Sequence, residues 1–225
     1  MKEFKLRAVI FDIDGTMIDT ERIQSDAFIK ALLRHGVQET PLTRYGTVHN
    51  PGESTSETWR RLKSIHDIPL DVDTLTEHKR KVAMDVLESD LIPMPGLMDL
   101  IQDLRKNHVK LALASSAQKD RVGRIVEGLG LINIFDVIVF ANDVENVKSA
   151  PDVYNKVVML LGVRPEEAIV LEDAQVGVES ARAAGVKVVA IPSEYTKKMN
   201  FNDAHFVVSS LGEINYEKLV SFIQE

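Results

Sequence analysis

Short runs of β-branched and other apolar residues alternate with helical patterns along the second half of the chain. The runs expected to form strands, after a first strand LRAVIF at 6–11, are VKLALA at 109–114, VIVFA at 137–141, AIVLE at 168–172 and VKVVAI at 186–191. Helical spacing of apolar residues lies between them, as in PGLMDLIQDLRKNH and SAPDVYNKVVMLLG. This alternation predicts an α/β fold, with a mostly parallel sheet covered by helices on both faces.

Residues 17–92 break this alternation. They contain three helical patterns, DTERIQSDAFIKALLRHG, STSETWRRLKSIH and DTLTEHKRKVAMDVLES, with no convincing strand between them. We therefore predict an all-helical cap domain at 17–92, inserted into a core made of 1–16 and 93–225. Because the insert leaves directly after the acidic turn that contains Asp12 and Asp14 and returns at LIPMPG, we interpret it as a lid domain whose two linkers flank a site.

Composition limits the classes of partner. A formal net charge of −7 gives no support for binding to nucleic acid or to a membrane surface. The chain has no cysteine, which excludes disulfides, thiolate catalysis and thiolate metal sites. The N-terminal residues do not resemble a signal peptide, and no apolar run approaches the length of a membrane span. We expect a cytoplasmic protein, a monomer or weak dimer, that acts on a small molecule.

Polar side chains follow four of the expected strands. They are Asp12 and Asp14 after the first strand, Ser115 and Ser116 after VKLALA, Lys148 a short loop after VIVFA, and Glu172 and Asp173 at the end of AIVLE. Because the carboxyl ends of parallel strands meet at one edge of a sheet, these side chains should converge. Carboxylates, a hydroxyl and an ammonium group together suit phosphoryl transfer, with room for a magnesium ion.

Four motifs in a fixed order carry a family resemblance. They are DIDGT, LALASS, KSAPDVY and VLEDAQVGVESARAAG. Together they resemble the haloacid dehalogenase superfamily, and within it the capped sugar-phosphate phosphatases and β-phosphoglucomutase-like members, over nearly the whole chain. The resemblance implies a Rossmann-like core with a helical cap inserted just after the first motif, which agrees with the predicted insert.

The first motif supplies the expected reacting groups. Asp12 is predicted to be the nucleophile, because an ionised carboxylate near a divalent cation can form an aspartyl-phosphate and so divide hydrolysis into two easier transfers. Asp14 is predicted to be the general acid and base, since burial and a neighbouring charge separate the two carboxyl pKa values. Gly15 permits close backbone approach, and N–H groups at Gly15 and Thr16 are predicted to bind phosphate oxygens.

The other motifs supply the remaining predicted contacts. Ser115 would donate a hydrogen bond to the phosphoryl group, with Ser116 as a second candidate, and Lys148 would neutralise charge shared with Asp12. The expected Mg²⁺ ligands are oxygens, which favours this hard cation: Asp12, Asp173, the backbone carbonyl of Asp14, and Glu172 either directly or through water.

Two further substrate contacts are predicted in the cap. His49 lies in TVHNPGES, a loop rich in turn-forming residues that could reach a closed site and set specificity. Glu21 lies where the cap begins and is a candidate substrate contact or an ordinary residue of the first cap helix.

The chain departs from the family pattern at two places. Its third motif reads Val147-Lys148-Ser149 where Gly-Lys-Pro is common, and Gly177 stands where some relatives have a further acidic residue. Asp14 argues against cleavage of carbon–halogen or carbon–phosphorus bonds, because dehalogenases and phosphonatases lack aspartate at this motif position.

The favoured function is a Mg²⁺-dependent phosphatase for a small phosphorylated metabolite, a sugar or polyol phosphate. A phosphosugar mutase is the enzymatic alternative, since the same core would serve both. A phosphoacceptor signalling protein is a third possibility, against which the helical insert speaks because a receiver needs no lid. A catalytically silent binding protein is the fourth.

Overall fold

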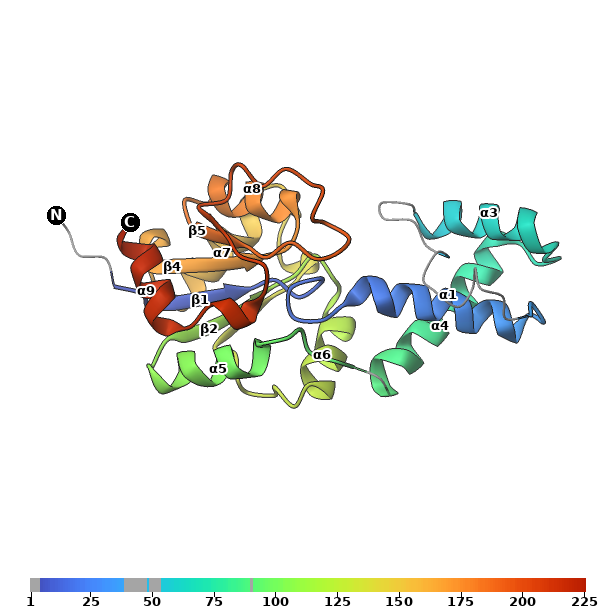
Figure 1. Cartoon of the computed structure of the whole chain (residues 1–225), viewed down its shortest axis with the longest axis horizontal. Coiled ribbons are helices and arrows are strands. Elements are labelled where there is room, and N and C mark those ends of the chain that lie inside the picture. The colour runs from blue at the N-terminus through green and yellow to red at the C-terminus, as the bar shows by residue number, and fades with distance from the viewer. Residues whose placement is uncertain (1–4, 39–47, 49–53, 90) are drawn as a thin grey trace. The chain divides into compact units, whose positions relative to one another are not determined.

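The computed structural model describes residues 5–38, 48, 54–89 and 91–225. The chain divides into two compact units (Figure 1), Met1–Asp19 with Ile92–Glu225, and Thr20–Leu91. The first unit contains the sheet. In the described part of the second unit, the regular elements are the helices α1, α3 and α4.

The sheet of the first unit has six parallel strands in the order β3-β2-β1-β4-β5-β6. Their bounds are β1 Ala8–Phe11, β2 Lys110–Ala114, β3 Val137–Val139, β4 Ala168–Glu172, β5 Lys187–Ala190 and β6 Phe206–Val207. β1 lies between β2 and β4, with Ala8 opposite both Lys110 and Ala168. The predicted α/β fold with a parallel Rossmann-like sheet is therefore confirmed.

Helices cover both faces of this sheet (Figure 1). Helices α7 (Asp152–Leu161) and α8 (Gln175–Ala183) pack on one face, over alternate residues of the central strands such as Ala8 and Ile10. Successive side chains of a strand point to opposite faces, and here helices cover both faces. Every side chain of a central strand is therefore buried, which explains why the central strands are continuous apolar runs.

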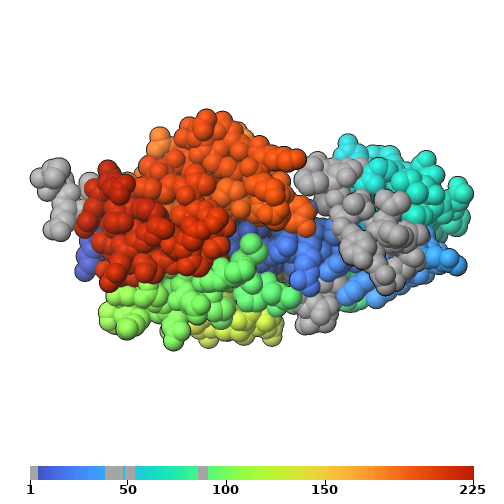
Figure 2. All heavy atoms as spheres, in the orientation of Figure 1, coloured from blue at the N-terminus to red at the C-terminus, as the bar shows by residue number. Residues whose placement is uncertain are grey.

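Helices α5 (Leu97–Lys106) and α9 (Tyr216–Gln224) contact strands β2 and β4 and each other. The Tyr216 N–H donates to Asp103 Oδ2 at 2.7 Å, which joins the start of α9 to α5. On the surface these two helices lie side by side, α5 in green and α9 in red (Figure 2). Helix α6 (Lys119–Gly128) follows β2 and presents its buried residues Val122 and Ile125 to the interior.

The described residues of the second unit contain α1 (Thr20–Arg34), α3 (Thr55–His66) and α4 (Val72–Ser89), close to the three helical patterns of the sequence. Helix α3 begins with a capping box between Ser54 and Glu57. The rings of Phe28 and Trp59 meet edge to face at 5.0 Å, so this unit has an apolar core of its own. Within the described residues, no helix is both long and apolar enough to cross a membrane.

The strands differ from the expected ones in two places. VIVFA is expected to extend to residue 141, but β3 ends at Val139 because a 3₁₀ turn, Ala141–Asp143, follows it. The Asp143 carboxylate accepts the Phe140 N–H at 2.9 Å and so takes that donor out of the sheet. The edge strand β6 is not predicted by the sequence, since it is two residues long and has no repeating pattern.

Candidate active site

Three acidic side chains meet at the carboxyl edge of the sheet. Asp12 directly follows β1, Glu172 is the last residue of β4, and Asp173 follows it. The Asp12 N–H still donates to Leu171 O at 3.0 Å, so the sheet holds the backbone up to this carboxylate. All three residues are buried, and one carboxylate oxygen from each lies within 4.8 Å of the others. The predicted convergence of these residues is present in the structure.

Lys148 reaches the same cluster from the loop that precedes α7. Its ammonium group donates to Asp12 Oδ1, to Glu172 Oε1 at 2.7 Å and to the backbone carbonyl of Ala114 at 3.0 Å. These acceptors use all of the N–H groups of the ammonium. The Lys148 side chain is 5% exposed, so its positive charge is directed at the two carboxylates rather than at solvent.

Burial and like charges shift the titration of this cluster. Burial raises the pKa of Asp12 well above its usual value, and Glu172 raises it further against the opposing effect of Lys148. Burial, followed by Glu172 and Asp14, raises the pKa of Asp173 from its usual 3.8 to about 7. Burial alone would lower the pKa of Lys148, but Asp12 and Glu172 outweigh it and raise that pKa. The cluster therefore holds more negative charge than Lys148 alone compensates.

This excess charge fits a divalent cation. The site contains three buried carboxylates and one ammonium group, which contacts two of them, so a formal excess of two negative charges is left when all are ionised. The donors Asp12, Glu172 and Asp173 are hard oxygen ligands of the kind that Mg²⁺ prefers. The chemistry of the donor set thus agrees with Mg²⁺, the cation used by phosphatases of the superfamily that the four motifs resemble.

The turn after Asp12 is shaped by Gly15. Its φ of +82° is in the left-handed region, and a Cβ atom there would lie 2.1 Å from Asp173 Oδ2. Its N–H, expected to bind phosphate, donates instead to Ile18 O at 2.9 Å within the turn. In this arrangement Gly15 allows Asp173 to approach the backbone. Thr16 is buried, and among the described residues its hydroxyl has no hydrogen-bond partner.

Asp14 has a different partner from Asp12. Arg121, in α6, donates to both of its carboxylate oxygens, Nη1 to Oδ2 at 3.0 Å and Nη2 to Oδ1 at 2.5 Å. The Asp14 side chain is 36% exposed, against 10% for Asp12. The two aspartates of the first motif therefore lie in different environments, and their different roles stay a prediction.

The two serines of the second motif differ in burial. Ser115 is 1% exposed, follows β2 at the same edge of the sheet, and accepts the Ala117 N–H on its Oγ at 3.0 Å. Its hydroxyl proton remains able to donate to a ligand. Ser116 is exposed. Of the two candidates for the phosphoryl contact, Ser115 is the one at the buried edge.

Sequence reasoning missed residues that hold the carboxylates of the site, among them a partner of Asp14 and two partners of the cluster. These are Arg121, Tyr154, whose hydroxyl donates to Glu172 Oε1 at 2.7 Å, and Thr196, whose hydroxyl donates to Asp173 Oδ2 at 3.4 Å. Burial, followed by Glu172, raises the pKa of Tyr154 well above its usual value, so the phenol stays protonated and donates. Tyr154 could have been noticed, because it ends the third motif, whereas Thr196 lies in a loop without any recognisable pattern.

The two predicted cap contacts, Glu21 and His49, stay predictions. Glu21 is the second residue of α1 and belongs to the second unit. His49 falls outside the described residues. A substrate contact by either residue stays a prediction.

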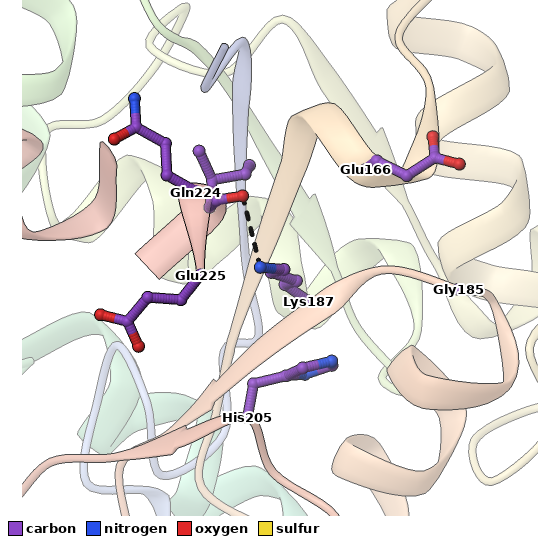
Figure 3. A pocket seen from close by; sticks show the side chains of 7 residues that line it. Glu166, Gly185, Lys187, His205, Gln224 and Glu225 are labelled. Carbon is purple, nitrogen blue, oxygen red and sulfur yellow. Dashed lines mark hydrogen bonds between the residues drawn. The ribbon is translucent and has the colours of Figure 1, made fainter. Parts of the chain in front are cut away.

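A cavity of about 230 Å³ lies elsewhere in the first unit (Figure 3). It is lined by residues at the amino ends of β5 and β6, among them Lys187 and His205, and by the C-terminal Glu225. The Lys187 ammonium donates to the carbonyls of Phe222 and Ile223 at 3.0 and 3.3 Å, which caps the end of α9. The cavity contains none of the residues predicted to act on phosphate.

Comparison with known proteins gives the family. Residues 9–191 match the model of the haloacid dehalogenase-like hydrolases. The chain is 29% identical over 214 residues to protein CbbY of Rhodobacter capsulatus, which covers 92% of this chain and 94% of that protein. It is 30% identical over 186 residues to the fructose-1-phosphate phosphatase YqaB of Escherichia coli, covering 81% and 95%.

A solved structure agrees with these sequence relationships. The crystal structure of CbbY from Rhodobacter sphaeroides in complex with phosphate superposes with a TM-score of 0.69 at 26% identity, covering 92% of this chain and 96% of that chain. The resemblance indicated by the four motifs is therefore confirmed. The chain belongs to the haloacid dehalogenase-like hydrolase family.

Proposed function

We propose that this protein is a Mg²⁺-dependent phosphatase that hydrolyses a small sugar or polyol phosphate through an aspartyl-phosphate on Asp12. The observation that carries the proposal is the buried Asp12–Lys148 ion pair inside a cluster of three carboxylates. A relative of matching length is a fructose-1-phosphate phosphatase, which supports a phosphorylated sugar as the substrate.

The first transfer uses Asp12 and Asp14. Lys148 contacts Asp12 Oδ1, so we assign the attack on phosphorus to Oδ2. The new O–P bond forms as the ester O–P bond breaks, and the departing alkoxide takes a proton from the Asp14 carboxyl group. Lys148 reduces the repulsion between the Asp12 carboxylate and the phosphate anion. Mg²⁺, when held by Asp12, Glu172 and Asp173, supplies further positive charge against the phosphoryl oxygens.

The second transfer returns the enzyme to its starting state. Asp14, now a carboxylate, takes a proton from water as that water attacks the phosphorus of the aspartyl-phosphate. The Asp12–phosphorus bond breaks, inorganic phosphate leaves, and Asp14 again carries the proton. The Ser115 hydroxyl would donate to a phosphoryl oxygen in both steps.

We assign to the helical unit Thr20–Leu91 the role of a lid that restricts the site to small substrates and keeps bulk water away. Glu21 and His49 are the proposed substrate contacts of this lid. We also propose that the protein works in the cytoplasm as a monomer or weak dimer, which cell fractionation and sedimentation would test.

Phosphate release from a panel of sugar, polyol and nucleotide monophosphates, with and without Mg²⁺, tests the function. The parent protein is compared with Asp12→Asn and with Asp203→Asn, a matched change at an exposed aspartate. We expect Mg²⁺-dependent release from the parent and from Asp203→Asn, and none from Asp12→Asn. A folded parent that releases no phosphate across the panel, but interconverts sugar phosphates when given a bisphosphate activator, would replace the phosphatase with a mutase.

A further inference from the structure

Tyr154 is a deeply buried hydroxyl-bearing residue in contact with the acidic cluster. It lies in the first turn of α7, is 0% exposed, and comes six positions after Lys148. Its hydroxyl donates to Glu172 Oε1 at 2.7 Å. None of the proposed catalytic steps uses this residue, although its position in the third motif places it on the same short stretch of chain as Lys148.

The Glu172 carboxylate is fixed from several sides. Oε1 accepts from both Tyr154 and Lys148, each at 2.7 Å, and Oε2 accepts from the Ala174 N–H at 3.4 Å. The backbone of Gly177 packs closely on the same group, since a Cβ atom there would lie 1.9 Å from Oε1. The carboxylate therefore has little room to turn, and Tyr154 is the donor that shares Oε1 with Lys148.

Lys148 connects Glu172 to the proposed nucleophile. Its ammonium group lies between Glu172 Oε1 and Asp12 Oδ1 and is 5.2 Å from the centroid of the Tyr154 ring. A small rotation of Glu172 would draw the ammonium group away from Asp12 or leave Glu172 without its cation. The position of Lys148 on Asp12 thus depends on the position of Glu172.

We propose that Tyr154 is a positioning residue for phosphoryl transfer, because its hydroxyl holds Glu172 in the orientation that keeps Lys148 on Asp12. This inference rests on the proposed function, in which Asp12 is the nucleophile. Tyr154 does not touch the reacting atoms, so it acts through Glu172 and Lys148. Its removal should affect the rate of transfer much more than the binding of substrate.

The test is a double-mutant cycle between Tyr154→Phe and Glu172→Gln. The first change removes one hydroxyl group and keeps the ring. A hydrogen bond to a charged partner supports an expected loss of about tenfold in kcat, with KM changed by less than about twofold. In the Glu172→Gln background, the same change should lower kcat by less than about twofold, because the neutral amide no longer carries the charge that pairs with Lys148 and so no longer links Tyr154 to Asp12. Equal loss in both backgrounds, or no loss in the parent, would overturn the proposal.

Two controls separate positioning from general destabilisation. Tyr216→Phe removes a hydroxyl at the start of α9, and Val157→Ala opens space in the buried face of α7. Tyr216→Phe should leave both stability and kcat unchanged. Val157→Ala should lower the denaturant midpoint with kcat kept within about twofold. If Val157→Ala lowers kcat as much as Tyr154→Phe does, the effect is packing and not positioning.

A crystal structure of Tyr154→Phe gives a readout that is independent of turnover. The proposal predicts that Glu172 rotates and that Lys148 loses contact with Asp12 Oδ1. An unchanged Asp12–Lys148–Glu172 arrangement would overturn the inference even if the enzyme is active. A parent protein that shows no Asp12-dependent phosphate release while the variant shows the rotation would instead contradict the proposed function alone.

Discussion

Whether Gly177→Ala raises or lowers the free energy of unfolding depends on how closely Gly177 packs against the active site. Gly177 lies in the first turn of α8, where alanine is normally the better helix former by up to about 1 kcal/mol. A Cβ atom at this position, however, would lie 1.9 Å from Glu172 Oε1 and 2.0 Å from Glu172 Cδ. Tyr154 and Lys148 both donate to Oε1 of that carboxylate, so it cannot move away without breaking hydrogen bonds.

The clash is expected to outweigh the gain in helix propensity. Overpacking of a filled interior costs about 1–3 kcal/mol, and disturbance of a buried ion pair adds to that cost. After subtraction of the helix term, we expect Gly177→Ala to lower the free energy of unfolding by about 2 kcal/mol. Because the displaced Glu172 takes Lys148 with it, kcat should also fall by at least about tenfold.

The matched control is Gly123→Ala in α6. Gly123 is also a helical glycine, but nothing lies within 4 Å of a Cβ atom built there. This change should raise the free energy of unfolding by about 0.5–1 kcal/mol and leave activity unchanged. Urea unfolding and Mg²⁺-dependent phosphate release would be measured on both variants. If Gly177→Ala is as stabilising as Gly123→Ala and fully active, Glu172 is not held tightly against Gly177 and the reasoning fails.

Three further predictions concern Asp173, Asp14 and Gly15. Because the pKa of Asp173 is raised to about 7, its contribution to the stability of the metal-free protein is full below about pH 4 and is lost as the pH rises through 7. Asp173→Asn should flatten that fall in urea unfolding, and Mg²⁺ should raise the midpoint of the parent more at about pH 8 than at about pH 5. Asp14→Asn should lower kcat/KM for alkyl phosphates by at least about 100-fold. For p-nitrophenyl phosphate the loss should be less than about tenfold, because a good leaving group needs no proton. Equal losses for the two substrates would contradict the role of Asp14 as general acid. Gly15→Ala should unfold more readily than the parent and lose Mg²⁺-dependent activity, because a Cβ atom would lie 2.1 Å from Asp173 Oδ2. Mg²⁺ binding with the affinity of the parent, measured by calorimetry, would contradict this prediction.

The residues that follow the strands could be predicted because parallel strands fix where they end. Once β1 and β4 are recognised as neighbours of a parallel sheet, Asp12 and Asp173 must meet at its carboxyl edge, whatever the loops do. Lys148 is placed by the same reasoning with one more step, since its loop follows β3. The sheet and this part of the site therefore follow from local pattern and topology.

The contacts made by helices could not be predicted in the same way. Arg121 reaches Asp14 across 107 positions of sequence, and Tyr154 reaches Glu172 only because of how α7 packs on the sheet. The direction of a helical side chain depends on the rotation of the whole helix, which no short motif encodes. For the Gly15 N–H, the sequence predicted a contact with phosphate, but in the structure this donor is used inside its own turn.

The most direct test of Asp12 as the nucleophile is mass spectrometry of the enzyme quenched with acid during turnover of its best substrate in the presence of Mg²⁺. We predict a phosphoryl group on the peptide that contains Asp12, which accumulates during turnover and is absent from Asp12→Asn. Steady release of phosphate by an Asp12→Asn variant, or a phosphoryl group found on a different residue, would contradict the assignment of Asp12 as the nucleophile.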